Sequence, residues 1–302
     1  MEQSLCIITS NVEVSPGIHL MWLEAQGIAC LAQPGQFVTV RCEELTLRRP
    51  LSIYQIFNAR KAKQSQIGLL FKIVGEGTFW LSQRQPGDKI DILGPLGNGF
   101  NIESEAKNLL LVAGGIGIAP LVFLSQHTSP RHSITLIHGA NTATQIYPFS
   151  SPQSEVLSHN SQQSNLPGLA GEVQFIPVTE DGSMGRKGRV TDILPDFLDW
   201  ADQIYACGPV DMYKAMAEIL LPDSSLASLD PHSSLPDSHS SLRAERSNPK
   251  IKKCQVSLEV RMGCGFGACY GCTINTRKGL KQVCRDGPIF ELSDVLWKEL
   301  KI

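Results

Sequence analysis

Near the C-terminus of this 302-residue chain lies the sequence Cys264-Gly-Phe-Gly-Ala-Cys269-Tyr-Gly-Cys272, with Cys284 further along. Four residues separate the first two cysteines, two separate the next pair, and eleven separate the last pair. Glycine and alanine occupy most positions between the first three. The backbone can therefore curve tightly and bring its N–H groups close to the sulfur atoms. This spacing predicts that the four thiols converge on one metal centre.

The spacing is typical of a plant-type 2Fe-2S cluster, which is held by four thiolates. A four-cysteine zinc site is the less favoured alternative, because zinc sites are usually built from two short pairs of cysteines. A pair of disulfides is less favoured still. An iron-sulfur cluster carries electrons, so the other parts of the chain are expected to exchange electrons with it.

Composition sets the broad class of the protein. Hydrophobic residues make up 42% of the chain and charged residues 19%, as in an ordinary soluble globular protein. The formal net charge of -2 argues against a nucleic-acid-binding protein. No apolar run reaches the roughly 18 residues of a membrane span, and Met1–Ser4 does not resemble the start of a signal peptide. The odd number of cysteines, nine, suits a reducing compartment, so we expect a cytoplasmic protein without a membrane partner.

Residues 1–102 are predicted to form a small antiparallel β-barrel or sandwich. Apolar segments alternate with turn residues such as Ser15-Pro16-Gly17 and Gln85-Pro86-Gly87-Asp88. One short helix is expected at Thr78–Gln83. The expected strands are Cys6–Val14, His19–Leu23, Phe37–Cys42, Leu51–Phe57, Gly68–Val74 and Lys89–Leu93.

Residues 103–221 are predicted to form an α/β domain with a parallel sheet. Apolar runs alternate there with helix-compatible or loop segments. A helix is expected at Pro209–Leu221, and a loop or irregular helix at Pro148–Pro167. The expected strands are Asn108–Val112, Ile134–Ile137, Val173–Val178 and Gln203–Ala206.

Residues 222–253 are rich in Ser, Pro and Asp and repeat the tripeptide Ser-Ser-Leu, so they predict a flexible linker or insertion. An interaction segment is the alternative. Residues 254–302 are predicted to form a small cluster domain. It is expected to begin with a strand at Gln255–Val260 and to end with a helix at Phe290–Leu300, in which Ser293 is the N-cap.

Two short motifs in the predicted barrel suit a phosphate group. In Arg49-Pro50-Leu51-Ser52, the guanidinium can pair with a phosphate and the hydroxyl can add a hydrogen bond. Gly75-Glu76-Gly77-Thr78 precedes a helix, where free N–H groups can bind an anion. Taken alone, each has an ordinary interpretation, as a surface arginine and as a plain turn. A third motif, Gly94-Pro95-Leu96-Gly97-Asn98-Gly99-Phe100, is most simply the turn that closes the barrel.

Two glycine turns mark one edge of the predicted parallel sheet. Ala113–Pro120 and Cys207-Gly208-Pro209 each follow a strand and precede a helix, which is where ligands bind in open α/β sheets. Either turn could instead serve only close helix–strand packing, and Cys207 could be an inert buried thiol. His138 is expected to be structural. The sequence contains no convincing hydrolytic triad or catalytic pair of carboxylates.

Taken in order, these motifs resemble the ferredoxin–NADP reductase superfamily over residues 1–221. The segments 257–272 and 283–290 are similar to one branch, the iron-sulfur flavoprotein subunit of type B dihydroorotate dehydrogenase. The resemblance implies a flavin-binding barrel, a nicotinamide-nucleotide domain and a 2Fe-2S domain.

The resemblance also implies the residues that hold each cofactor. For FAD these are Arg49, Pro50, Leu51, Ser52, Leu70, Phe71, Lys72, Gly77 and Thr78. For NAD they are Gly114, Gly115, Gly117, Pro120, Cys207, Gly208 and Pro209. For the cluster they are Cys264, Cys269, Cys272 and Cys284. No arginine stands in His138-Gly139-Ala140-Asn141 to bind a 2′-phosphate, which favours NAD over NADP.

The implied function is electron transfer in pyrimidine biosynthesis. Dihydroorotate would be oxidised on an FMN-containing partner subunit, and electrons would reach NAD+ through the cluster and FAD, in a heterotetramer with two subunits of each kind. One alternative is an electron-transfer subunit of a hydrogenase or of an NADH–ferredoxin oxidoreductase. Another is a zinc-stabilised binding module on the same scaffold. The Ser-rich tract departs from the family pattern by lengthening the connection to the cluster domain.

Overall fold

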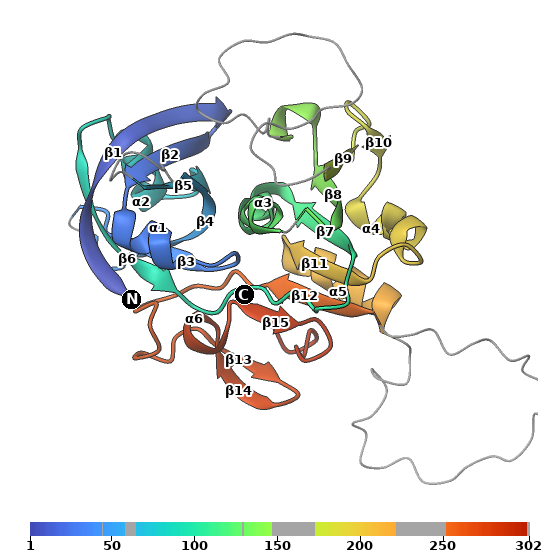
Figure 1. The fold of residues 1–302 in the computed structure, drawn as a ribbon. Coiled ribbons are helices and arrows are strands. Elements are labelled where there is room, and N and C mark those ends of the chain that lie inside the picture. Colours follow the sequence, from blue (N-terminus) through green and yellow to red (C-terminus); the bar gives the residue numbers. More distant parts are fainter. Residues whose placement is uncertain (44, 58–64, 129, 147–172, 222–251, 301–302) are drawn as a thin grey trace, which may run out of the picture.

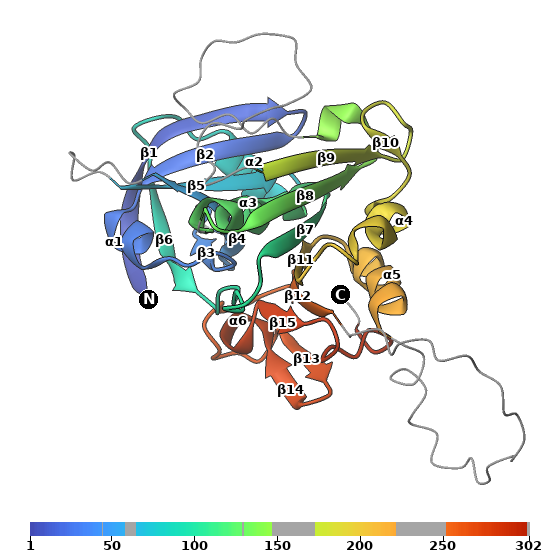
Figure 2. The same cartoon turned by 45° about the vertical axis from the view of Figure 1, so that its right-hand side comes forward.

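The computed structural model describes the chain except for residues 44, 58–64, 129, 147–172, 222–251 and 301–302. It contains a closed barrel, a seven-stranded sheet and a small C-terminal module that lies below both in the view of Figure 1. The turned view of Figure 2 shows the same module under the sheet, with strand β12 entering the sheet from it. None of the helices in the described part of the chain is long and apolar enough to cross a membrane.

The barrel confirms the predicted six antiparallel strands. Their order around the barrel is β1-β2-β5-β4-β3-β6, and apolar side chains such as Val38, Ile53 and Leu69 fill the interior. At the turn after β1, Gly17 has a φ of 73°, which favours glycine. The strands are β1 (Glu2–Ser15), β2 (Ile18–Glu24), β3 (Phe37–Val40), β4 (Arg49–Phe57), β5 (Gln66–Lys72) and β6 (Lys89–Leu96).

Two short helices accompany the barrel. Helix α2 (Glu76–Ser82) begins two residues earlier than the predicted helix. Helix α1 (Gln26–Leu31) was not predicted from the sequence. Its six residues carry no side-chain cap, and its stability comes from Ile28 and Ala29, which are buried in the barrel core. Tertiary packing of this kind leaves little local sequence signal.

The sheet confirms the predicted parallel α/β architecture. Its order is β10-β9-β8-β7-β11-β12-β15, and only the pair β12–β15 is antiparallel. Strand β7 is apolar without alternation because both of its faces are covered. The strands are β7 (Asn108–Gly114), β8 (Ser133–Ala140), β9 (Val173–Thr179), β10 (Arg186–Lys187), β11 (Gln203–Cys207), β12 (Lys253–Ser257) and β15 (Ile289–Glu291).

Helix α3 (Ile118–His127) lies between the barrel and the sheet, where it contacts β4 and β7 (Figure 1). Residues 118–125 are all buried, as expected of a helix that is covered on every side. Helix α5 (Val210–Leu220) confirms the helix predicted after Cys207. The remaining helices are α4 (Val190–Ile193) and the 3-10 turns η1 (Gly115–Gly117), η2 (Ala143–Gln145) and η3 (Leu194–Phe197).

The C-terminal module shares strands with the sheet. Strand β12 pairs in parallel with β11, and β15 pairs with β12, so both strands extend the parallel sheet. Between them lie the hairpin β13 (Thr273–Thr276) and β14 (Gly279–Gln282) and the single turn of α6 (Val283–Asp286). The domain boundary drawn at residue 254 stays a prediction, but the module is tied to the sheet by two strands.

The prediction of a helix at Phe290–Leu300 is wrong. The structure has strand β15 followed by turns, in which Leu292, Val295 and Trp297 are buried. Val295 forms a bridge with Thr276, and Trp297 Nε1 donates a 2.8 Å hydrogen bond to the Leu292 carbonyl. Pairing with β12 and β13 therefore overrides the helical propensity of the segment. The loop predicted at Pro148–Pro167 lies outside the described residues, and so does the Ser-rich tract apart from Lys252 and Lys253, where β12 begins.

Candidate functional site

The four predicted cluster cysteines lie together in the C-terminal module. The sulfurs of Cys272 and Cys284 are 3.3 Å apart, and the thiol of Cys264 interacts with that of Cys269. Backbone N–H groups surround the sulfurs, as an iron-sulfur site requires. The donors, each with its sulfur acceptor, are Cys264 to Cys269 at 3.4 Å, Ala268 to Cys264 at 3.2 Å, Gly267 to Cys284 at 3.1 Å and Cys284 to Cys272 at 3.4 Å.

Glycine makes this loop possible at two kinds of position. Gly265 and Gly267 have φ values of 80° and 92°, which side chains rarely adopt. At Gly263 the constraint is space, because a Cβ atom there would lie 3.1 Å from the Cys269 sulfur. The small residues of the motif thus turn the N–H groups inward and leave room around the sulfurs.

The loop changes the acidity of its thiols in opposite directions. At Cys264, burial raises the pKa, but hydrogen bonds from the backbone N–H groups of Phe266, Cys269 and Ala268 together lower it to about 6. At Cys284, burial and the neighbouring Cys272 thiol raise the pKa to about 12. A bound cation would offset the raised pKa of Cys284, because metals bind thiolates.

The sulfur arrangement fits a two-iron cluster, in which each iron takes two protein ligands. The two contacting pairs are Cys264 with Cys269 and Cys272 with Cys284. Within the described residues, no three His, Cys, Asp or Glu side chains form one group around a single metal ion, so the four sulfurs lie as two pairs. The fit of the cluster therefore rests on the paired sulfurs and on their N–H donors.

The structure brings the two phosphate-type motifs of the barrel together. Arg49 begins strand β4, and its guanidinium lies against Gly77 in the first turn of α2 so closely that a side chain on Gly77 would collide with it. Thr78 holds the turn before the helix. Its hydroxyl accepts hydrogen bonds from the N–H groups of Val74 at 2.9 Å and Gly75 at 3.2 Å. The Arg49 guanidinium thus lies beside the first turn of a helix, where an anion can bind.

The other predicted flavin residues line adjacent strands. Leu51 and Ser52 continue β4, and Leu70, Phe71 and Lys72 end β5. Leu70 and Phe71 are buried, whereas the Lys72 side chain is exposed at the edge of a cavity.

That cavity of about 480 Å³ lies between the barrel and the carboxyl edge of the sheet. Ile18 and Lys72 line it from the barrel, and Gly114, Gly115 and Pro209 line it from the sheet. The two glycine turns predicted to bind a nucleotide therefore do meet at one site.

Four of the predicted nucleotide residues do not line the cavity, namely Gly117, Pro120, Cys207 and Gly208. Gly117 packs so tightly on the Cys207 carbonyl and the Gly208 N–H that any side chain there would collide with them. The Cys207 thiol is fully buried, which raises its pKa well above its usual value, and Pro120 is buried in α3. The contact of Gly117 with Cys207 and Gly208 packs the two turns against each other.

His138 also supports the first turn, as its predicted structural role requires. Its Nε2 lies 3.0 Å from the Gly115 carbonyl oxygen, and its ring is buried. Burial lowers the pKa of His138 to about 4, although the hydrogen bond to Gly115 opposes this shift. The imidazole is therefore neutral at neutral pH.

Sequence reasoning missed the charged residues of the cavity. Glu180, which follows β9, and Arg189, which precedes α4, both line it, and the Arg189 Nε lies 3.8 Å from a Glu180 carboxylate oxygen. The strand end at His138–Asn141 holds no arginine, and the arginine of the cavity comes from another segment. Arg189 is far from that strand in sequence, and only the parallel sheet brings it to the same edge. Asn141 and Gln145 are further lining residues.

The barrel contacts both this cavity and the cluster loop. Gly265, next to the first cluster cysteine, packs on Thr39 of β3, where a Cβ atom would lie 2.7 Å from the Thr39 Cγ2. Thr39 is paired with Pro50 in the register of β3 and β4. The cluster loop therefore rests on the barrel beside the residues predicted to bind the flavin.

Comparison with known proteins agrees with this arrangement. A family model described as the iron-sulfur cluster binding domain of dihydroorotate dehydrogenase B matches residues 259–296. A second, described as an oxidoreductase NAD-binding domain, matches residues 111–218. A curated relative from Desulforamulus reducens is 34% identical over 94% of this chain and 95% of its own length. It is named as the electron transfer subunit of dihydroorotate dehydrogenase B (NAD(+)).

This chain belongs to the family of dihydroorotate dehydrogenase B electron transfer subunits. A member from Caldanaerobacter subterraneus is 32% identical over 96% of this chain and 97% of its own length. The resemblance inferred from the motifs is thereby confirmed.

Solved structures place the fold more broadly. A structure of an NADH-dependent reduced ferredoxin–NADP oxidoreductase, described in a study of flavin-based electron bifurcation, has a TM-score of 0.72 and is 27% identical. It covers 98% of this chain, which covers 91% of it. A ferredoxin NADP+ reductase from Neisseria gonorrhoeae with bound FAD and NADP has a TM-score of 0.57 at 18% identity, covering 73% of this chain and 91% of its own. The latter similarity supports the fold alone.

Proposed function

We propose that this chain is the electron-transfer subunit of an NAD-dependent dihydroorotate dehydrogenase. In this role it carries FAD on the barrel, a 2Fe-2S cluster in the C-terminal module and NAD in the cavity. Nicotinamide exchanges two electrons as hydride and the cluster passes one at a time, so a flavin is needed between them. The observation that carries the proposal is the position of the barrel, which contacts both the cavity, through Lys72, and the cluster loop, through Thr39.

Arg49 would bind the FAD pyrophosphate together with the first turn of α2. Its guanidinium is already held against Gly77, so the charge is positioned before the cofactor arrives. Pro50, Leu51 and Ser52 would line the flavin along β4. Leu70, Phe71 and Lys72 would do so at the end of β5, where Lys72 also reaches the nucleotide cavity.

Glu180 would select NAD over NADP. It lines the cavity beside Arg189, whose positive charge it partly neutralises. A carboxylate can accept a hydrogen bond from a ribose 2′-hydroxyl, whereas it repels a 2′-phosphate. The net preference is therefore for the unphosphorylated dinucleotide, even though an arginine is present.

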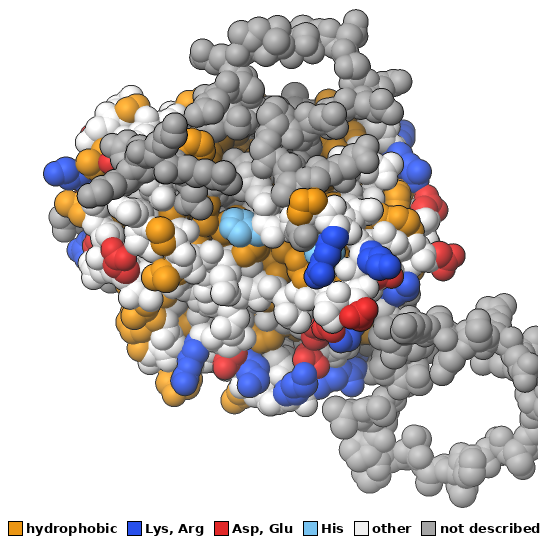
Figure 3. Space-filling model, in the orientation of Figure 1, with side chains coloured by type: hydrophobic (Ala, Val, Ile, Leu, Met, Phe, Trp, Pro, Cys, Tyr) orange, Lys and Arg blue, Asp and Glu red, His pale blue; other side chains and the backbone are white. Residues whose placement is uncertain are grey.

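The partner would be a catalytic subunit that contains FMN and oxidises dihydroorotate, with two subunits of each kind in the complex. Phe266 and Tyr270, which lie in the cluster loop, are 48% and 69% exposed, and Leu280 on the hairpin of the same module is 71% exposed. Lys and Arg side chains gather along the lower edge of the surface in Figure 3, in the region of the C-terminal module. Exposed aromatic side chains in the cluster loop, with charged side chains on the same module, are suited to docking a partner.

The second candidate is an electron-transfer subunit of an NADH–ferredoxin oxidoreductase type of complex. The structural similarity to the NADH-dependent oxidoreductase over nearly the whole chain favours it. The curated relatives, at 32–34% identity over similar lengths, favour the dihydroorotate dehydrogenase complex.

Assays of the purified chain test the proposal directly. We expect visible absorption bands of both flavin and an iron-sulfur cluster, and NADH-dependent reduction of a dye. We expect no dihydroorotate oxidation until the catalytic subunit is added. Turnover of dihydroorotate by the chain alone, or a colourless protein that contains zinc, would show that the proposal is wrong. Copurification with a hydrogenase or ferredoxin-type partner would favour the second candidate.

A further inference from the structure

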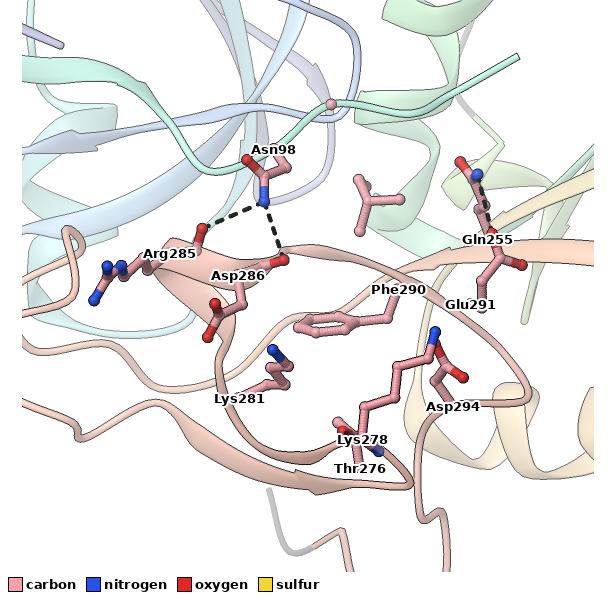
Figure 4. Close-up of a pocket in the computed structure, with 12 residues that line it drawn as sticks. Asn98, Gln255, Thr276, Lys278, Lys281, Arg285, Asp286, Phe290, Glu291 and Asp294 are labelled. Carbon is pink, nitrogen blue, oxygen red and sulfur yellow. Dashed lines mark hydrogen bonds and ion pairs between the residues drawn. The ribbon is translucent and has the colours of Figure 1, made fainter. Parts of the chain in front are cut away.

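The turn that closes the barrel is also a joint to the cluster module. After β6, the Asn98 side chain amide donates hydrogen bonds to the carbonyl oxygens of Arg285, at 3.3 Å, and Asp286, at 3.0 Å (Figure 4). The backbone N–H of Asn98 donates a third, at 2.6 Å, to the carbonyl of Gly287. One barrel residue thus binds three successive carbonyls of the module.

These carbonyls directly follow Cys284 in α6. Helix α6 is a single turn, so the carbonyls at its end can move little without moving the cysteine sulfur. The neighbouring Gly97 packs against Pro288 so closely that a Cβ atom would lie 2.5 Å from the Pro288 Cδ. On the other side of the cluster, Gly265 rests on Thr39 of the barrel.

We propose that Asn98 is a positioning residue, which fixes the distance and orientation of the cluster relative to the flavin. This inference rests on the proposed function, because it requires both cofactors. Asn98 contacts neither of them directly. It acts through the end of α6, and electron transfer between two fixed centres falls steeply as their separation grows.

The hydrogen bonds of Asn98 add polar contacts to the packing of Gly97 on Pro288 at this joint. Asn98 lies at the mouth of a cavity of about 420 Å³, lined in part by Lys281, Asp286, Phe290 and Glu291 (Figure 4). This cavity lies next to the Gly97–Pro288 contact, and the Asn98 amide bridges the barrel and the module beside it. An amide suits the task, since its two N–H bonds can serve two carbonyls, whereas a carboxylate in its place would repel them.

The test compares three variants of the full chain loaded with FAD and cluster. Asn98→Ala removes both side-chain hydrogen bonds, and Asn98→Asp replaces the donors by acceptors of the same size. Asn275→Ala is the matched control. It removes another amide hydrogen bond of the module, the 2.8 Å bond to Glu299, which does not involve the barrel.

Four measurements distinguish positioning from general damage. Anaerobic stopped-flow mixing with NADH follows the rate at which one electron of the reduced flavin passes to the cluster. NADH-dependent dye reduction follows the flavin alone. The EPR spectrum of the reduced cluster and hydrogen exchange of residues 283–288 follow the cluster itself and the joint.

We expect Asn98→Ala and Asn98→Asp to slow cluster reduction by about tenfold, as small misplacements of reacting groups commonly do. Dye reduction and the EPR line shape should stay as in the wild type, while exchange in residues 283–288 becomes faster. Asn275→Ala should match the wild type in all measurements.

Unchanged cluster reduction in both Asn98 variants would overturn the inference, and so would an equal loss of dye reduction. If Asn98→Ala loads no cluster, the milder Asn98→Ser decides by the same criteria. If the wild-type chain itself passes no electrons from NADH to the cluster, the proposed function fails instead.

Discussion

The four cluster cysteines lie within residues 264–284, whereas the lining of the cavity between the barrel and the sheet is drawn from positions between Pro16 and Ala215. In the cluster loop, the chain that supplies the sulfurs also supplies the N–H groups that surround them. In the cavity, the barrel, the ends of several strands and a helix start must all be in place before any wall exists. The loop loses its function when one cysteine ligand is removed. The assembled cavity loses its function when any contact that holds its turns together is disturbed.

The largest expected effect comes from removing one cluster ligand. Cys269→Ser should abolish the iron-sulfur absorption and EPR signals and reduce coupled dihydroorotate oxidation to background, because the cluster needs four thiolates. NADH-dependent dye reduction should persist, since the cavity and the barrel share no residue with the loop. Coupled activity that survives with partner present would contradict the assigned electron path.

A steric change should disable the assembled cavity without touching its lining. Gly117→Ala would place a Cβ atom against the Cys207 carbonyl and the Gly208 N–H, which are backbone atoms that cannot rotate away. We expect a loss of about 1–3 kcal/mol in the free energy of unfolding, as in other overpacked sites, together with a raised KM for NADH.

Thermal melts and steady-state kinetics check this outcome. Gly75→Ala serves as the control, because its φ of 179° is open to any residue and no atom lies within 4 Å of the added Cβ. Equal stability and equal KM for NADH in the two variants would show that the two glycine turns can move apart without loss.

The same contrast explains what the sequence could predict. The cluster cysteines and the parallel strands were recognisable because spacing and continuous apolar runs are local signals. Arg189 and Glu180 were missed because nothing in their own neighbourhood marks them, and strands β8, β9 and β10 must pair before they face the cavity. Cys207 is buried and does not line the cavity, and its part in nucleotide binding stays a prediction.

The fold shows the same limit at the C-terminus. Phe290–Leu300 has a plausible N-cap and helix-forming residues, yet pairing of β15 with β12 and burial of Trp297 give strand and turns. Helix α1 is the converse case, since Ile28 is buried in the barrel although no local signal predicts a helix. In both segments, partners distant in sequence decide the outcome.

Acid should lower the free energy of unfolding through His138, which lies behind the first turn of the cavity. Its pKa is lowered to about 4 by burial, against a usual value of about 6.5, so the unfolded chain binds a proton more readily than the folded one between these values. The stabilisation is complete above pH 6.5 and is lost as the pH falls towards 4, by up to about 3 kcal/mol. His138→Gln removes the titrating group and should flatten this part of the pH profile in denaturant unfolding experiments. A slope that is unchanged in the variant would assign the acid sensitivity to other groups.

The smallest expected effect concerns the choice of dinucleotide. Glu180→Gln keeps the shape of the side chain but removes the charge beside Arg189, so the cavity becomes more positive and accepts a 2′-phosphate more easily. Both side chains are more than half exposed, so the change should be modest, about fivefold in the ratio of kcat/KM for NADPH to that for NADH. Arg189→Gln is the matched variant and should lower that ratio. If Glu180→Gln leaves the ratio unchanged while Arg189→Gln alters it, the arginine acts alone and the carboxylate has no part in specificity. The cluster signals should be identical in both variants, because the assembled cavity and the local loop share no residue.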